Sequence, residues 1–155
     1  MDSFTRFIPD GTELDAGAIR AAGLAALPFP EWASPDDIVA MGRLAGAERA
    51  ELWSCQHQQQ PHHLGGLSLD EAGRQSFDLG YANVLVAFES AETYVWQPLD
   101  HEFFVVFAPP PILETIRSAG LFTHDFHAYA REDYFKGARS EYLVEMESRY
   151  TVVPS

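Results

Sequence analysis

The chain has 155 residues, of which 46% are hydrophobic and 13% aromatic, so it has enough apolar material for a core and falls outside the disordered class. Its length suits one globular domain, residues 1–155. The 23 acidic residues outnumber the 10 basic ones, and the formal net charge of −13 disfavours binding to nucleic-acid phosphates or to anionic membrane lipids.

Three further features bear on where the protein works. The longest apolar run, Phe103–Pro111, is much shorter than the about 20 residues that span a membrane. The N-terminal stretch MDSFTRFIPDG lacks the basic start and the apolar run of a signal peptide. The single cysteine excludes an internal disulfide and agrees with a reducing compartment. We therefore expect a cytoplasmic protein.

The first third of the chain is predicted to hold one strand and two helices. Residues 4–11 are predicted as a short strand that a Pro-Asp-Gly turn closes. Residues 14–27 place apolar side chains near one helical face and are predicted as a helix. Ser34 is a good N-cap and is followed by a proline and two aspartates, so a second helix is predicted over about 35–44.

The middle of the chain favours strands. Residues 50–59 alternate after Leu52 and are consistent with a strand, and a short helix or turn is predicted for SLDEAGRQSFDLG. The stretches 81–89, 92–97 and 101–108 are rich in Val, Phe, Tyr and Trp and are separated by polar or turn-forming residues. We predict three successive strands in an antiparallel meander.

The last third is predicted to be helical. Helices are expected after Pro109–Pro111, over 123–132 and over 138–150, and the tail 151–155 is either a frayed end or an edge strand. The sum is an α+β fold, in which a small, mostly antiparallel β-meander sheet packs against helices from both ends of the chain.

The negative charge is concentrated in the middle of the sequence. Residues 50–116 hold nine acids and one base, for a net charge of −8. The segments on either side, 1–49 and 117–155, have net charges of −4 and −1. An excess of this size attracts basic partners. The alternative is that the charge only keeps the protein in solution, as it does in many acidic proteins.

The stretch CQHQQQPHHLGG suggests two kinds of site and one structural alternative. Cys55, His57, His62 and His63 lie within nine residues, but their spacing matches no zinc pattern, and adjacent histidines rarely face one ion. Cys55 and His57 would lie on the same face of a strand, where the histidine could act as the base for a cysteine nucleophile. The structural alternative is a core cysteine followed by an exposed, flexible connector.

Two other clusters are candidates for chemistry. His124 and His127 are three apart and would share a helical face, so they are the weak candidates for a metal-binding or proton-passing pair. Asp100 and Glu102 flank His101 at the start of a strand and could act as paired carboxylates, as an acidic patch or as a solvated strand start.

Several familiar motifs are missing from the sequence. It contains no glycine-rich phosphate loop, no dinucleotide fingerprint, no Gly-x-Ser-x-Gly elbow and no Cys-x-x-Cys pair. No catalytic residue and no cofactor is therefore predicted.

The acidity, the small size and the meander YANVLVAFES–TYVWQP–HEFFVVF followed by helices resemble the bacterial immunity proteins that neutralise secreted toxins. The resemblance implies stoichiometric inhibition of one cognate toxin. A nuclease toxin would fit this resemblance, because nuclease toxins tend to be basic and the carboxylates of an inhibitor can take the place of phosphates.

On this hypothesis a basic protein is the partner, and nucleic acid and membrane are not. The carboxylates of the predicted surface would steer the partner, and two aromatic side chains would anchor it. The predicted partner-binding residues are Asp78, Glu89, Glu92, Tyr94, Trp96, Asp100 and Glu102. The alternatives are a small enzyme or metal-binding domain that uses the histidines, and a structural subunit of a homo-oligomer.

Overall fold

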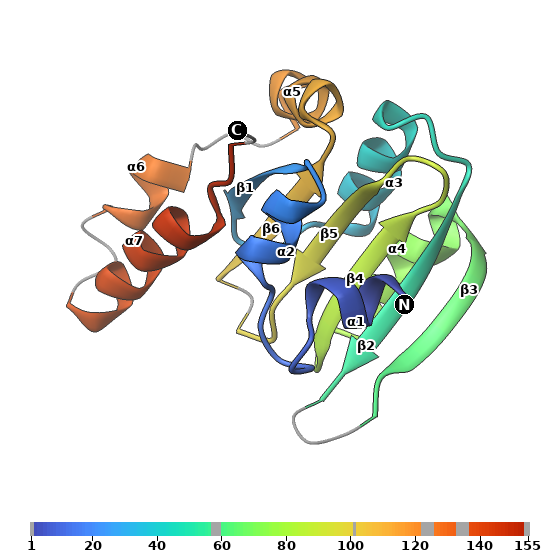
Figure 1. Ribbon diagram of the computed structural model, residues 1–155, viewed down its shortest axis with the longest axis horizontal. Coiled ribbons are helices and arrows are strands. Elements are labelled where there is room, and N and C mark those ends of the chain that lie inside the picture. The colour runs from blue at the N-terminus through green and yellow to red at the C-terminus, as the bar shows by residue number, and fades with distance from the viewer. Residues whose placement is uncertain (1, 57–59, 101, 122–125, 133–136, 154–155) are drawn as a thin grey trace.

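A computed structural model of the chain describes residues 2–56, 60–100, 102–121, 126–132 and 137–153 (Figure 1). Six antiparallel strands form one sheet in the order β1-β6-β5-β4-β2-β3. The strands are β1 (Ala25–Pro30), β2 (Arg49–Cys55), β3 (His62–Ser68), β4 (Asn83–Phe88), β5 (Thr93–Gln97) and β6 (Phe103–Ala108). The helices are α1 (Ser3–Phe7), α2 (Ala16–Ala21), α3 (Pro35–Leu44), α4 (Leu69–Asp78), α5 (Pro110–Ser118), α6 (Phe126–Ala130) and α7 (Ala138–Tyr150).

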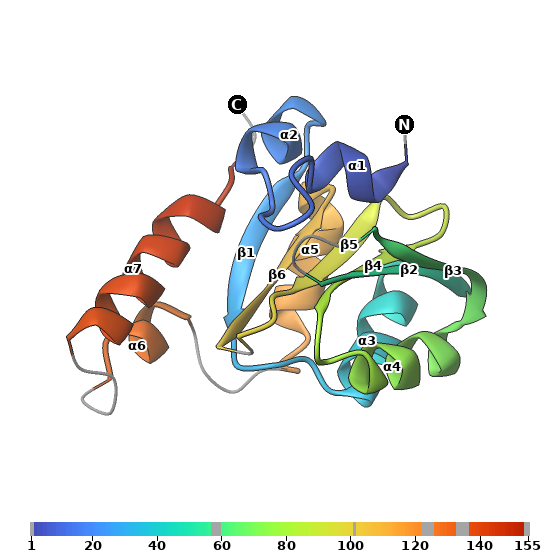
Figure 2. The same cartoon turned by 90° about the horizontal axis from the view of Figure 1, so that it is seen from below.

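Helices cover both faces of the sheet, so the molecule has three layers (Figure 2). Helices α1, α2, α6 and α7 pack on one face, and α3, α4 and α5 pack on the other. The predicted α+β fold, with helices from both ends of the chain against the sheet, is confirmed. The second helical layer goes beyond the prediction, and because of it every residue of the central strands β5 and β6 is buried.

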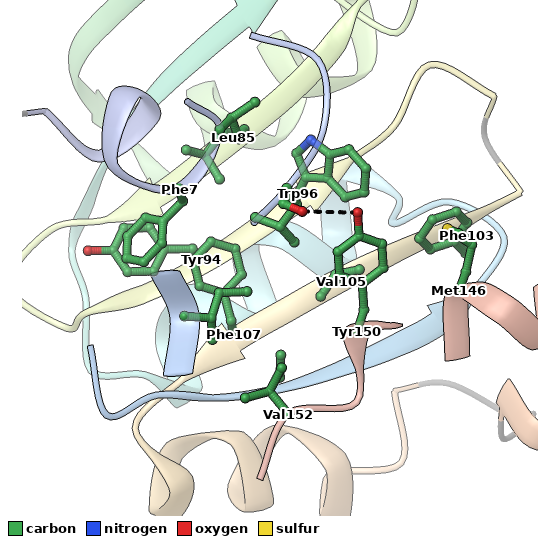
Figure 3. Packing of buried hydrophobic residues seen from close by; sticks show 14 of the residues in the cluster. Phe7, Leu85, Tyr94, Trp96, Phe103, Val105, Phe107, Met146, Tyr150 and Val152 are labelled. Carbon is green, nitrogen blue, oxygen red and sulfur yellow. Dashed lines mark hydrogen bonds between the residues drawn. The ribbon is translucent and has the colours of Figure 1, made fainter. Parts of the chain in front are cut away.

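The core under α1, α2 and α7 is rich in aromatic rings (Figure 3). The Phe7 ring lies 5.0 Å from the Tyr94 ring and 4.9 Å from the Phe107 ring. The buried Tyr150 hydroxyl donates a hydrogen bond to the carbonyl oxygen of Leu14 at 3.1 Å. This bond joins the C-terminal helix to the segment that precedes α2.

Local sequence signals predicted several elements correctly. Helix α3 begins after Ser34, whose side chain accepts from the backbone N–H of Asp37, and it ends at the predicted residue 44. Strands β4, β5 and β6 form the predicted antiparallel meander. Helix α7 matches the predicted range 138–150. In the tail, Val152 forms a single antiparallel bridge with Ala26 at the β1 edge.

The predictions for the N-terminal segment were wrong. The predicted strand over 4–11 is instead helix α1, because the Asp2 carboxylate accepts a hydrogen bond from the backbone N–H of Thr5 and caps a helical turn. The predicted helix over 14–27 ends at residue 21. Gly23 has a φ of 74°, a conformation that terminates a helix, and the chain then enters β1.

The connector expected after Cys55 also contains regular structure. Residues 62–68 form the edge strand β3, which pairs with β2 and has a register shift between Ala50 and Leu52. This strand has few β-branched residues, so its conformation depends on pairing with β2 rather than on local preference. The flexible connector predicted from Gln58–Gln60, Pro61 and Gly65–Gly66 was therefore wrong at Gly65–Gly66, and Gln58 and Gln59 lie outside the described residues.

Candidate partner-binding surface

The structure divides the five predicted acidic residues between the two ends of the sheet. Glu89 and Glu92 lie in the connection between β4 and β5, whereas Asp100 and Glu102 lie in the connection between β5 and β6. Consecutive connections of antiparallel strands lie at opposite ends, about 17 Å apart for strands of this length. Asp78 ends α4 just before β4 begins, which places it at the Asp100 end. The single acidic surface that we expected does not form.

The two predicted aromatic anchors lie in the core. Tyr94 is 8% exposed and stacks on Phe107 at 4.8 Å between ring centroids. Trp96 is 4% exposed and packs 5.6 Å from the Tyr150 ring (Figure 3). The anchor role predicted for them is therefore wrong, since a side chain covered by α1 or α7 cannot contact a partner without unfolding.

Helix α7 holds two of the predicted acids in place. The Tyr142 hydroxyl donates to Asp100 Oδ2 at 2.6 Å, and the Arg139 guanidinium pairs with the Glu102 carboxylate. Burial and the Asp100 carboxylate together raise the pKa of the Tyr142 hydroxyl. The Tyr142 hydroxyl orients the Asp100 carboxylate, whereas the charge of Glu102 is offset by an arginine.

The same end of the sheet exposes apolar side chains that the sequence analysis did not single out. Phe77 is 58% exposed, Tyr81 60% and Leu99 49%. Phe77 lies in the last turn of α4, Tyr81 precedes β4, and Leu99 follows β5. Since folding normally buries such side chains, several at one end mark a candidate interaction site.

Specific contacts hold Trp32, Phe77 and the backbone of Leu99 at this end of the sheet. The Trp32 ring stacks on the Phe77 ring at 5.7 Å and 17°. A β-carbon at Gly80 would lie 2.1 Å from a ring atom of Trp32, so the close approach of α4 and Trp32 requires glycine there. The backbone N–H of Leu99 donates to Asn83 Oδ1 at 2.8 Å, which joins the β5–β6 connection to the start of β4.

Carboxylates flank this apolar group. Asp78 and Asp100 are exposed beside it, and Glu31, next to Trp32, is exposed as well. The backbone N–H of Glu31 donates to the Glu102 carbonyl at 3.1 Å, which fixes that segment at the same end. We call this set the Phe77 surface. It consists of Glu31, Trp32, Phe77, Asp78, Tyr81, Leu99 and Asp100.

Of the predicted Cys55–His57 pair, the structure describes only Cys55. Cys55 is 4% exposed in the core under α1 and α2, and burial raises the pKa of its thiol. A buried neutral thiol is a poor nucleophile. The low exposure of Cys55 confirms the prediction that it is a core residue. His57 lies outside the described residues.

The remaining histidines are dispersed. His62 pairs with Ser54 and His63 with Trp53, so these adjacent histidines point to opposite faces of the sheet. His127 Nδ1 lies 3.2 Å from Glu147 Oε1, which Arg131 also contacts. His101 and His124 lie outside the described residues. Within the described ranges, no three His, Cys, Asp or Glu side chains are grouped as a metal site.

No protein-family model, no curated protein and no solved structure matches this chain. Of the helices in the described part of the chain, none combines the length and the apolar character needed to cross a bilayer.

Proposed function

We propose that this protein is a cytoplasmic, immunity-type inhibitor that binds a basic bacterial toxin through the Phe77 surface. The observation that carries the proposal is the exposure of Phe77, Tyr81 and Leu99 beside the carboxylates of Asp78 and Asp100. The apolar group supplies the affinity that Tyr94 and Trp96 cannot supply from the core.

Each part of the surface has a distinct physical task. Exposed aromatic rings that enter a pocket of the partner lose water and dominate the binding energy, and truncation of one such ring costs about 2 kcal/mol or more. The carboxylates act earlier in the process. Opposite charge raises the association rate towards about 10⁸ M⁻¹s⁻¹ at low salt, which suits an inhibitor that must reach its target before the substrate does.

The charge pattern defines the chemistry of the partner. Asp78, Asp100 and Glu31 are exposed at the same end of the sheet as the apolar rings, so the complementary surface presents lysine or arginine side chains around an apolar pocket. A nuclease has cationic side chains where it binds phosphates, and carboxylates can occupy those positions. Inhibition of such an enzyme would follow from direct occlusion of its substrate site.

The proposal predicts a gene for a toxic domain beside the gene for this protein, and the test uses that domain in purified form. We expect Phe77→Ala and Leu99→Ala each to speed dissociation by about 30-fold, the factor that corresponds to about 2 kcal/mol. We expect Asp78→Lys/Asp100→Lys to slow association and to reduce its dependence on salt. Surface plasmon resonance at two salt concentrations measures both rates.

A charge-matched control comes from the far end of the sheet. Glu89→Lys/Glu92→Lys changes the net charge by the same amount, but both residues lie in the β4–β5 connection. Association at its wild-type rate in this control, with slow association in the Asp78/Asp100 variant, supports the proposal. Equal effects of the two double variants would show that only net charge matters, and a homodimer held together by Phe77 would assign the surface to self-association. Either result rejects the proposal.

A further inference from the structure

A hollow is lined by residues of α1, β2 and β3, on the face of the sheet opposite to α4. Its volume is about 650 Å³, within the range of small-molecule sites. The lining residues are Asp2, Ser3, Phe4, Thr5, Glu51, Trp53, Gln60, Pro61 and His63. None of them belongs to the Phe77 surface.

The fold arranges the floor of the hollow through strand register. Trp53 and His63 are direct partners in the β2–β3 pairing, so their side chains lie on one face and their rings stack at 4.5 Å and 19°. Glu51 precedes Trp53 by two residues on β2 and shares that face. Its Oε1 lies 3.8 Å from His63 Nε2. Trp53 and Phe4 are each 4% exposed, so these two aromatic side chains form a buried floor beneath the hollow.

The described lining of the hollow has an excess of acidic side chains. Asp2 and Glu51 provide two carboxylates, and no lysine or arginine is among the described residues that line the hollow. The pKa of Asp2 is lowered, chiefly by the backbone N–H of Thr5 and to a smaller extent by the Thr5 hydroxyl, the N-terminal ammonium and His63, so its carboxylate stays ionised. Glu51 is 38% exposed and His63 46%, so both can be reached from solvent.

We propose that this hollow binds a primary ammonium or guanidinium group carried on a short alkyl chain. The cationic head would lie between the Glu51 and Asp2 carboxylates, where charge-assisted hydrogen bonds are available. The alkyl chain would lie along the ring of His63, which is held against Trp53. A guanidinium beside such a ring also gains cation–π attraction. An anion of the same size is excluded by the two carboxylates.

The two sources of this chemistry are a free diamine and an arginine side chain of a protein. Agmatine is the probe for the first source, and acetyl-Gly-Arg-Gly-amide is the probe for the second. 4-Guanidinobutyrate has the guanidinium of agmatine but a carboxylate at the other end, so it serves as the charge control. NMR of the Trp53 indole N–H and of the His63 ring protons, in the full-length protein, locates the bound probe.

We expect saturable binding of agmatine with a Kd of about 1 mM, and much weaker binding of 4-guanidinobutyrate. Tighter binding of the peptide would identify a protein side chain as the source, and tighter binding of agmatine would identify a free amine. Either result supports the proposal. If neither probe shifts the Trp53 and His63 signals, the proposal is rejected.

Variants separate this site from general attraction to an acidic protein. Glu51→Gln keeps the size of the side chain and is expected to weaken agmatine binding about tenfold. Glu51→Lys places a cation in the hollow and is expected to abolish saturable binding. Glu141→Gln, on α7 beyond the opposite edge of the sheet, removes the same charge and should leave the Kd within about twofold. Equal weakening by Glu51→Gln and Glu141→Gln would show non-specific attraction and would reject the proposal.

Discussion

Gly73 lies in the middle of α4 where this helix crosses α3, and we predict that Gly73→Ala destabilises the protein. A β-carbon built at Gly73 would lie 2.6 Å from the carbonyl oxygen of Pro35 and 3.1 Å from its Cα, and β-carbons in proteins essentially never make contacts under 3.0 Å. The obstructing atoms belong to the backbone at the first turn of α3, so no side-chain rotation relieves the contact. The two helices must separate.

The magnitude follows from two opposing effects. Overpacking at a tight contact costs about 1–3 kcal/mol, and the upper end applies because backbone must move. Alanine in a helix interior is better than glycine by about 1 kcal/mol. We therefore expect a net loss of about 2 kcal/mol in the free energy of unfolding, which lowers the Tm by about 4–8 °C for a protein of this size.

Urea unfolding followed by circular dichroism measures this loss. Arg74→Ala is the control, because Arg74 is the exposed neighbour on the same helix and its replacement should change stability by at most about 0.5 kcal/mol. Since α4 also carries Phe77, the Gly73 variant should bind the toxin more weakly than the Arg74 variant. A Gly73→Ala protein as stable as wild type would refute the packing argument, because helix preference alone would then decide the outcome.

Two further predictions concern buried polar groups. Gln97 Nε2 donates to Ser76 Oγ, and Gln97 Oε1 has no partner among the described residues. Ser76→Ala should therefore lower the free energy of unfolding, measured in urea, by about 1–3 kcal/mol. The double variant Ser76→Ala/Gln97→Leu should lie within about 1 kcal/mol of wild type. An equal loss in both variants would contradict this. Burial, with a smaller effect of Glu102, raises the pKa of Tyr129 to about 12. The neutral phenol is favoured in the folded state, so its contribution to stability is present below pH about 10 and is lost as the pH rises towards 12. As the pH rises from about 8 to 11, the urea concentration at the unfolding midpoint should fall less steeply in Tyr129→Phe than in wild type. Identical slopes in the two proteins would count against the effect.

The predictable parts of the fold are those with strong local signals. The Ser34 cap defined α3 to the residue, and the apolar runs of β4, β5 and β6 predicted a meander that their pairing confirms. Strand β3 could not be predicted in this way, because its sequence HHLGGLS resembles a connector and only the pairing with β2 makes it a strand.

The candidate surface was predicted only in part. Asp78 and Asp100 belong to it, but Glu89 and Glu92 lie at the far end because strand direction, not distance along the sequence, determines which connections meet. Tyr94 and Trp96 were predicted as exposed anchors, but the helical layer that includes α1, α2 and α7 covers their face of the sheet. Conversely, nothing in the sequence distinguishes the exposed Phe77 from the phenylalanines of the core, because its exposure depends on which elements of the fold lie beside it.

The pairing of β1 with β6 has a consequence during protein synthesis. Pro30 pairs with Phe103, so the ribosome must add more than seventy residues after β1 before its partner strand exists. At elongation rates of about 5–20 residues per second this interval lasts about 4–15 s. During this interval β1 is an apolar segment without its partner strand β6, and such a state is prone to aggregation. Pro28 and Pro30 have no amide hydrogen to donate, and they therefore hinder other nascent chains from pairing with β1 before β6 arrives.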